Sequence, residues 1–417
     1  MKNQSIFRTL STIRGNQRAC LFTEPLWGIP FNLYVPFVSV YMAAFGMDAL
    51  QIGFVGTVFL MSQMFWSLLS GVITDKLGRR TTTLIFDLLS WTIPTLLWMG
   101  AQNYTWFLVA ALFNGAWRIT ETSWGLLLIE DAPDDWLVNL YSITHIAGLI
   151  AGFVAPLAYF FVQRYSVVPT MRVLYGITAF MMTLKFVILY FMTTETKMGK
   201  RRMKETKGES IFSQFKGNAQ VLKQMFLDKG IILTVLLLAC YNGIKAVGDT
   251  FWPLLITQNL NIATENLSIF STIKSLLMLA TYFVIVPHLS IRKFKNPLLL
   301  AFVLMLCQQT LMILMPTGAF VLVIVCVVLE AVALSMISPL TYSLQMLTID
   351  KVERARMLGL FYAMTMLLTA PLTTLSGMMA KVLPTAPFFL NAFLTLCAFL
   401  LSLMIWKEKK DTIITAE

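Results

Sequence analysis

The decapeptide GVITDKLGRR runs from Gly71 to Arg80 and lies between two long apolar runs. Gly71 can let another helix approach closely, and Gly78 can let the chain turn sharply. Asp75 can accept hydrogen bonds from an exposed helix N-terminus, and Arg79 and Arg80 can each bind a carboxylate through two N–H groups. We therefore expect a charged hairpin that holds packed helices together without the permanence of apolar burial.

The chain around this stretch is strongly apolar, with 57% hydrophobic and only 13% charged residues among 417. The surface of a soluble protein of this size needs far more charge. A membrane-spanning helix needs ~20 mostly apolar residues, because each residue rises only ~1.5 Å through the bilayer. Such runs recur along the whole chain and predict twelve transmembrane helices. They lie near residues 19–45, 51–74, 82–101, 105–129, 138–162, 172–193, 230–257, 267–289, 297–315, 318–345, 356–380 and 386–406.

The net charge of +11 is distributed along the chain in a way that argues against a nucleic-acid partner. Most lysines and arginines lie near the two termini and in alternate loops. Only Arg164, Arg172 and Lys381 lie in the other loops. This is the positive-inside pattern, which predicts a multi-pass protein of the cell membrane with both termini in the cytoplasm.

Two halves of the chain resemble each other. The segment YVPF…GMDALQI, which begins at Tyr34, aligns with FWPL…ATENLSI, which begins at Phe251. Internal repeats with a site between them are typical of secondary transporters. We expect an N-terminal six-helix bundle over residues 1–193 and a C-terminal six-helix bundle over 229–417.

A cytoplasmic linker is predicted between the bundles, over residues 194–228. Its first part, TETKMGKRRMKETKGES, is too polar to enter hydrocarbon. Its second part places Ile211, Phe215, Leu222 and Phe226 on one side of a helix. We expect an amphipathic helix along the inner membrane surface, with a regulatory helix as the alternative.

The opening decapeptide resembles the loop 2–3 signature of the major facilitator superfamily. The resemblance covers the whole chain through the predicted helix number and the central basic loop. It implies an all-α fold of two pseudo-symmetric bundles that work by alternating access. It also implies that the loop is a conformational latch, which stabilises the outward-facing state through contacts near helix 11 and charge pairs near the end of helix 4. Glu130 and Asp131 are the acids that could meet Arg79 or Arg80.

The chain also departs from patterns within that family. Many proton-coupled members carry an arginine four residues before a glycine of helix 4, where this chain has Ala111 before Gly115. The glycine-rich stretch that drug/proton antiporters carry on helix 5 is only partly present in GLIAGFVAPLAY at 148–159. This departure weakens a multidrug efflux interpretation.

Ionisable residues inside transmembrane segments are costly, about 2.5–3.5 kcal/mol each on insertion scales, and usually face a cavity or a partner. The resemblance implies that helices 1, 4, 7 and 10 line a central cavity. Arg118 and Glu121, Lys245, and Glu330 lie near the middle of three of these helices. We expect Arg118, Lys245 and Glu330 to act in the cavity, with local pairing of Arg118 to Glu121 and of Lys245 to Asp249 as the alternative.

The roles expected of the other charged residues depend on which helix carries them. Asp87 and Lys185 lie on outer helices and are expected to be structural, whereas both roles stay open for His145 and Lys274. Glu330 or Glu121 is expected to be the proton-sensitive group, because a carboxylate in a cavity can change protonation as the cavity opens and closes. The complete predicted substrate-binding or coupling set is Glu24, Asn32, Arg118, Glu121, Trp124, Lys245, Asp249 and Glu330. For the tryptophan, packing is the alternative role.

These observations predict a monomeric secondary active transporter of a small polar organic solute. Proton coupling is expected, with sodium as the alternative. No nucleotide, metal or cofactor motif accompanies the pattern, and the histidines carry no catalytic spacing, so we expect no enzyme activity. The first rival is a multidrug/proton antiporter of the same fold, against which the mid-membrane charges argue. The others are a lipid-handling protein and a transporter-like sensor.

Overall fold

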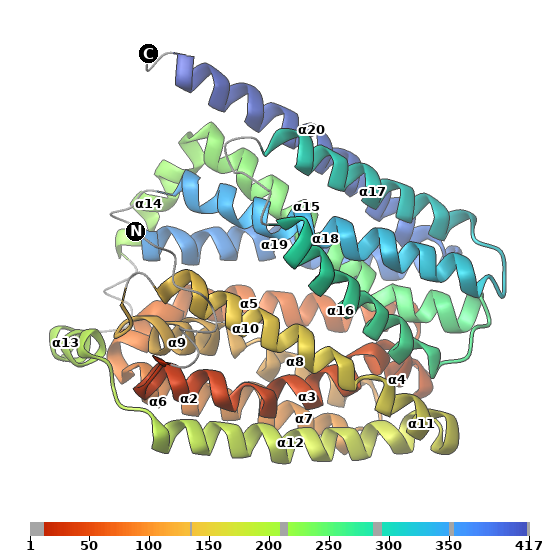
Figure 1. Cartoon of the computed structure of the whole chain (residues 1–417), viewed down its shortest axis with the longest axis horizontal. Helices are drawn as coiled ribbons and strands as arrows, with labels where there is room; N and C mark the ends of the chain where they lie inside the picture. Colours follow the sequence, from red (N-terminus) through yellow and green to blue (C-terminus); the bar gives the residue numbers. More distant parts are fainter. Residues whose placement is uncertain (1–11, 134–135, 209–215, 287–293, 350–353, 415–417) are drawn as a thin grey trace.

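The computed structural model describes residues 12–133, 136–208, 216–286, 294–349 and 354–414. Within these ranges the regular secondary structure is helical throughout. Figure 1 shows the helices running roughly side by side in two groups, with the first half of the chain below the second. The two groups are called here the first and the second bundle.

The first bundle contains several helices that are interrupted within one span. Prolines stand at three of these interruptions, at Pro25, Pro36 and Pro156, because proline lacks the N–H that a continuing helix needs. The helices are α2 (Gly15–Thr23), α3 (Pro25–Tyr34), α4 (Val38–Ala44), α5 (Ala49–Leu77), α6 (Arg79–Asp87), α7 (Ile93–Met99), α8 (Tyr104–Asn114), α9 (Trp117–Ile129), α10 (Leu137–Ala151), α11 (Pro156–Tyr165) and α12 (Val167–Met192).

The second bundle consists of longer helices, and two shorter ones form the linker. The linker helices are α13 (Lys197–Glu205) and α14 (Lys216–Leu227). The helices of the second bundle are α15 (Lys229–Leu254), which continues as a wider turn to Asn259, α16 (Asn266–Val284), α17 (Lys295–Leu314), α18 (Phe320–Thr348), α19 (Arg354–Val382) and α20 (Ala386–Ile414).

Eleven helices in the described ranges are long and apolar enough to cross a membrane, one fewer than the sequence predicts. The difference arises in the predicted span 105–129, where the chain breaks between α8 and α9. At the break, Gly115 lies so close to α5 that a Cβ atom there would overlap the Ser62 side chain. The break divides the predicted fourth span into α8 and α9, which are each too short to be counted alone, so the span is present but is not one continuous helix.

The closest contact between the bundles joins α5 to α19. A Cβ atom at Gly53 would collide with the carbonyl oxygen of Thr373, and one at Gly377 would collide with the backbone at Ala49. The Thr57 hydroxyl donates to the Ala370 carbonyl oxygen at 2.6 Å. Small residues thus bring the two backbones together, as they do in membrane helix pairs generally.

The two ends of the helices are packed differently. At the end opposite the linker, called the far end, buried residues of both bundles form one apolar cluster, which contains Tyr41 of the first bundle and Phe251 of the second. Towards the linker end, one buried cluster belongs to the first bundle, around Leu128, and another to the second bundle and α14, around Phe294. The bundles therefore share their large apolar core at the far end, and a smaller shared cluster of Leu60, Met366 and Ala370 lies farther along α5 and α19.

The linker helices attach to different bundles. α13 lies beside α5, whereas α14 packs on α15 and α19. On α14, Val221 and Met225 are buried in the cluster of the second bundle, but Phe226 is exposed. The predicted apolar face is therefore wrong in register: Leu222 lies at the edge of the contact and Phe226 outside it, while Ile211 and Phe215 lie outside the described residues.

Candidate functional site

Charged side chains form two groups near the middle of the spans, one in each bundle, and Tyr342 lies within electrostatic reach of both groups. We call them the central charged set. Its members are Arg118 and Glu121 on α9, Lys245 and Asp249 on α15, Lys274 on α16 and Glu330 on α18. Three are cations and three are anions, so the set carries no formal net charge.

Arg118 is held in a largely buried position by contacts from three helices. Its Nη1 donates to Glu121, one turn away on the same helix, and its Nε donates to Gln63 Oε1 on α5 at 3.0 Å. The guanidinium also lies 4.9 Å from the ring centre of Tyr362 on α19. A residue of the first bundle thereby contacts the second bundle through a cation–π interaction.

Glu330 finds its partner on a neighbouring helix. Lys274 Nζ on α16 donates to Glu330 Oε1 at 2.7 Å, and both side chains are partly buried. For Lys274 the sequence left the role open, and the structure places it in the central charged set. The spacing along α18 could not reveal this pair, because the partner comes from another helix.

Lys245 and Asp249 lie one turn apart on α15, and both are exposed to solvent. Among the described residues, no hydrogen bond or ion pair joins either of them to a partner, so the local pair that the sequence offered as an alternative is not formed. Their charges act at longer range: Lys245 interacts with Tyr241 and more weakly with Asp249, Tyr342 and Glu330, and Asp249 interacts with Lys274. They therefore face the inner helices α16 and α18 although they are solvent-accessible.

Tyr342 on α18 connects the two parts of the set. It interacts electrostatically with Arg118 and Glu121 of the first bundle and with Lys245 of the second. Its ring meets that of Tyr241 edge to face, with ring centres 6.3 Å apart. The charges of the two bundles thus face a common region lined by tyrosines.

Glu24 and Trp124 belong to a different cluster, inside the first bundle. Lys185 Nζ donates to Glu24 Oε2 at 2.7 Å, and the Lys185 ammonium also lies 5.6 Å from the ring centre of Trp124. Asp87 is buried beside this pair and interacts with its charges. The sequence grouped Glu24 with the cavity residues and Lys185 with the structural ones, but their side chains form one buried pair.

Asn32 is engaged within its own helix. Its side-chain amide donates to the Gly28 carbonyl oxygen at 2.8 Å. The indole Nε1 of Trp124 is buried and has no hydrogen-bond partner among the described residues. The side chain of His145 lies outside the described residues.

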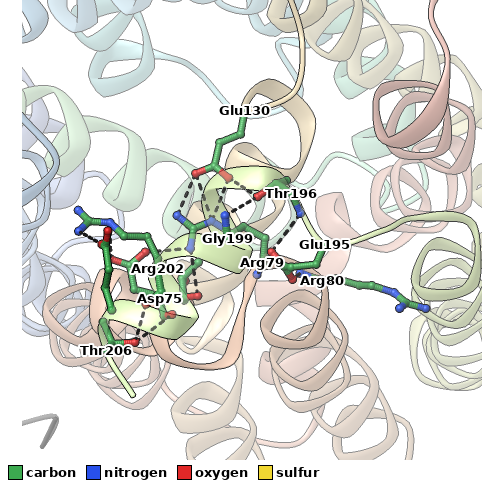
Figure 2. Close-up of polar contacts among 11 residues, drawn as sticks. Asp75, Arg79, Arg80, Glu130, Glu195, Thr196, Gly199, Arg202 and Thr206 are labelled. Carbon is green, nitrogen blue, oxygen red and sulfur yellow. Dashed lines mark hydrogen bonds and ion pairs between the residues drawn. The ribbon is translucent and has the colours of Figure 1, made fainter. Parts of the chain in front are cut away.

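The charged hairpin of the opening decapeptide is a compact ionic cluster at the linker end (Figure 2). Arg79 is almost completely buried; it binds Glu130 through Nε and Nη2 and Asp75 through Nη1, at 2.8–3.1 Å. The turn between α5 and α6 depends on Gly78, whose φ of +83° disfavours other residues. This forked binding of one arginine by two carboxylates ties together the ends of α5, α6 and α9.

The linker contributes the anion that caps α6. Both oxygens of Glu195 accept backbone N–H groups, from Arg79 and from Arg80, each at 3.0 Å. Thr196 donates its hydroxyl to Glu130, and Arg202 of α13 lies 3.7 Å from Asp75. A carboxylate at this position suits the partial positive charge of a helix N-terminus.

Two details of the predicted latch are wrong, those of Asp75 and Asp131, and two others, those of Gly71 and helix 11, are not formed in this state by the residues that the structure describes. Asp75 pairs with Arg79 and does not cap a helix. Nothing lies within 4 Å of a Cβ atom placed at Gly71, so this glycine allows no close approach in this arrangement. Asp131 accepts from the Lys197 backbone N–H rather than from an arginine. Among the described residues, the hydrogen bonds and ion pairs of the cluster join only the first bundle and the linker.

Arg80 points away from the cluster, as Figure 2 shows. Its Nε donates to the Tyr190 carbonyl oxygen at 2.7 Å, and its guanidinium stacks 3.9 Å from the centre of the Tyr190 ring. It thus fastens α6 to the end of α12 and binds no carboxylate through its side chain among the described residues.

An ion pair also joins the bundles at the far end. Lys381 Nζ on α19 lies 2.7 Å from Asp48 Oδ2, and Asp48 caps α5 by accepting the Gln51 backbone N–H. The Lys381 ammonium and the Gln51 N–H hold the pKa of Asp48 below its ordinary value. This pair was not predicted from the sequence.

Comparison with known families shows to which family the chain belongs. The sequence matches the model of the Major Facilitator Superfamily over residues 26–318 and 249–414. The chain belongs to this superfamily. It is accordingly a multi-pass membrane protein and a secondary transporter that binds a small-molecule substrate, and not an enzyme. No curated protein matches the sequence.

Solved structures of other transporters superpose on nearly the whole chain of this superfamily member. Nucleoside transporter NupG matches with a TM-score of 0.72 at 14% identity, covering 94% of this chain and 100% of its own. A POT family transporter in complex with 5-aminolevulinic acid matches at 0.71 and 15%, covering 94% and 95%. The human organic anion transporter MFSD10 (TETRAN) matches at 0.64 and 13%, covering 96% and 100%. At these identities the likeness shows the fold alone.

Sequence reasoning missed several residues of these sites in the superfamily member. Glu195 had a signal, since it is an acid at the start of a basic linker, but its partner on α6 lies far away along the chain. Tyr342, Tyr362 and Gln63 had none, because uncharged polar residues are common in the spans. Asp48 lay in the quoted repeat but had no partner until α5 and α19 were placed side by side.

Proposed function

We propose that this transporter carries a small polar organic solute through alternating access, with the solute bound at the central charged set. The observation that carries the proposal is that Arg118 of the first bundle lies 4.9 Å from the ring centre of Tyr362 in the second bundle, where Tyr342 also lies within reach of Lys245. Charge inside a membrane protein is costly and is retained where it serves a substrate or an ion. A site made by both bundles is also the arrangement that rocking motion can expose to either side.

The described arrangement supports one state of that cycle. The bundles share a large apolar core and the Asp48–Lys381 pair at the far end, whereas the buried residues of the two clusters nearest the linker come from one bundle each, with α14 joining the second. We propose that this state is open towards the linker end. The positive-inside pattern supports the cytoplasm for this end and for both termini, in the cell membrane.

The relatives support a polar solute. They are described as a nucleoside transporter, an organic anion transporter and a POT family transporter in complex with 5-aminolevulinic acid. Polar and charged solutes of this kind suit a site with three cations and three anions better than the apolar compounds expected of a multidrug antiporter. We propose that the protein works as a monomer, from bundles of residues 1–193 and 229–417 joined by the linker 194–228.

Protons are proposed to drive transport, with Glu330 or Glu121 as the group that binds them. Both carboxylates belong to the central charged set, and each is paired with a cation, Glu330 with Lys274 and Glu121 with Arg118. Sodium is the alternative coupling ion. Neither carboxylate lies in the dry interior, so water can deliver the proton.

Uptake into proteoliposomes tests this proposal. Purified protein is reconstituted and supplied with radiolabelled alanine, uridine, glucose or citrate, under an imposed pH gradient or an imposed sodium gradient. We expect at least one solute to accumulate under the pH gradient and a proton ionophore to abolish that accumulation. Accumulation under the sodium gradient alone would replace protons by sodium, and export of apolar dyes without uptake of any polar solute would contradict the proposal.

A further inference from the structure

Two opposite charges in the central charged set lack a close partner, and they define what the solute must supply. Arg118 is satisfied by Glu121, and Glu330 is satisfied by Lys274. Lys245 and Asp249 remain: both are exposed, they attract each other only at longer range, and neither has a hydrogen bond or ion pair to any residue in the described ranges. The site therefore offers one cation and one anion to a ligand.

We infer that the solute is a short zwitterion of the amino-acid type, whose carboxylate binds Lys245 and whose ammonium binds Asp249. The inference rests on the proposed transport function and adds the substrate class to it. An anionic solute would neutralise Lys245 and leave Asp249 unpaired, and a cationic solute would do the reverse. An unpaired charge in a closed site is strongly unfavourable, so a solute that satisfies both is favoured.

The spacing of the two residues limits the length of the zwitterion. Residues four apart on a helix have Cβ atoms ~5–6 Å apart and project from one face. The lysine stem is long and flexible, so its ammonium can approach or withdraw from Asp249. Two charged groups that are separated by a few bonds fit this spacing. The two termini of a long peptide are too far apart to bind both residues at once.

The charge balance of the set leads to the same class. Before a proton binds, the site has three cations and three anions, so it stays neutral when a zwitterion enters and gains a net charge when a singly charged solute enters. Net charge is costly where water is partly excluded. Tyr241 and Tyr342 pack edge to face beside Lys245, which gives the apolar part of such a solute an aromatic surface to contact.

Matched ligands test the inference on the unmodified protein. Thermal unfolding of the purified transporter is measured with alanine, leucine and γ-aminobutyrate, and with the N-acetyl and carboxamide derivatives of each. We expect at least one zwitterion to raise Tm and both of its blocked derivatives to bind about tenfold more weakly or worse, because each lacks one charge-assisted hydrogen bond. Equal binding of a blocked derivative, or no binding of any zwitterion, overturns the inference.

Two variants then assign the ends of the solute. In Lys245→Met the carboxamide should bind as well as the parent zwitterion, and in Asp249→Asn the N-acetyl derivative should do so. Lys229→Met is the matched control, because Lys229 is an exposed lysine at the start of the same helix. Each comparison is made between ligands within one variant, so a general loss of stability cannot produce the pattern. A variant that still rejects its own blocked derivative contradicts the assignment.

Uridine and citrate separate a failure of this inference from a failure of the proposed function. If either one stabilises the protein and accumulates in proteoliposomes while no zwitterion binds, transport at this site stands and the zwitterion inference falls. If zwitterions bind with the expected pattern but never accumulate, the inferred ligand class is supported and the proposed transport function is contradicted.

Discussion

Lys185 is a lysine buried within the first bundle, and its charge is neutralised by Glu24 on another helix. Removing one partner of a buried ion pair leaves the other charge uncompensated, at a cost of about 3–5 kcal/mol. We therefore expect Lys185→Met to lower the free energy of unfolding by about this amount, measured by denaturation of the purified protein in detergent.

The double variant is the control for this prediction. In Glu24→Gln/Lys185→Met no charge is left unpaired at the pair itself, so we expect a smaller loss than in Lys185→Met alone. Lys229→Met, at an exposed site, should change the stability little. If the double variant is less stable than the single one by the full additive amount, the two residues do not act as a pair.

The ion pair of Glu330 with Lys274 gives a second residue-scale prediction. If Glu330 binds the coupling proton, Glu330→Gln cannot change its protonation, so we expect uptake that no longer rises with the pH gradient. The rate of exchange between equal solute concentrations should persist, since exchange does not need net proton movement. Uptake is compared with that of Glu121→Gln, which should then keep its pH dependence.

If Glu121→Gln loses the pH dependence of uptake and Glu330→Gln keeps it, Glu121 is the residue that binds the coupling proton. Full pH-dependent uptake in both variants would remove both carboxylates from the coupling role and contradict the proposed proton site.

Sequence spacing predicted residue pairs only where both partners lie on one helix. The pair of Arg118 with Glu121 could be predicted, because the two residues are three apart on one helix. The pairs of Glu24 with Lys185 and of Glu330 with Lys274 were not, because they depend on which helices are neighbours and how each is rotated. A periodicity of apolar residues fixes neither quantity in a span that is apolar on most of its faces.

At the scale of elements, α13 is attached to the first bundle chiefly through Glu195, which caps α6. We expect Glu195→Ala to release α13, because the variant loses two backbone hydrogen bonds and an anion at a helix N-terminus. Trypsin should then cut faster after the exposed Lys197 and Lys200, as followed by mass spectrometry of a time course.

Glu205→Gln is the matched control for the release of α13. Glu205 is an acid of the same helix that pairs only within it among the described residues, with Arg201 and Arg202. It should leave the cleavage rate unchanged. Equal rates in Glu195→Ala and the unmodified protein would show that other contacts hold α13 in place.

The Asp48–Lys381 pair predicts a pH dependence of the far end. The pKa of Asp48 is lowered while the ends are joined, so the pair favours the joined state above the ordinary carboxylate pKa. This contribution is lost as the pH falls through the lowered pKa. Because both side chains are about half exposed, we expect the ratio of molecules with the far end joined to molecules with it open to change by no more than about fivefold. Distances between spin labels at Gln102 and Thr317, exposed on the two bundles at this end, measure it.

Substitutions test whether this particular pair is responsible. Asp48→Asn and Lys381→Met should each open the far end at neutral pH, and the double variant should open it no further. Removal of another exposed far-end charge, in Arg164→Gln, should have no effect. A far end that stays joined in both single variants assigns its closure to the apolar cluster alone.

Helix contacts show which part of an element could be predicted. Glycines in a span indicate that some other helix approaches closely, but the sequence alone does not tell which glycine makes the contact. The opening stretch favoured Gly71, whereas α5 meets α19 at Gly53. The break at Gly115 was not predicted either, and there the chain lies against Ser62 of α5, a contact that the local sequence does not reveal.

At the scale of the whole molecule, the fold was the most predictable property. The length of the apolar runs determines the spans, the distribution of lysine and arginine predicts their direction, and the decapeptide indicates the family. Which end of the bundles is joined was not predictable, because the same sequence must be compatible with both states of an alternating-access cycle and the difference between them is a few kcal/mol.

The most direct test of the account asks whether the central charged set is reached from both sides of the membrane in turn. Asn242 lies one turn before Lys245 on the same face of α15, so Asn242→Cys leaves the charges intact. In a variant whose five native cysteines are replaced, a membrane-impermeant maleimide is applied to right-side-out and to inverted vesicles. The account predicts labelling from both sides and protection by a transported solute. Labelling from one side only, or from neither, would contradict alternating access to this site.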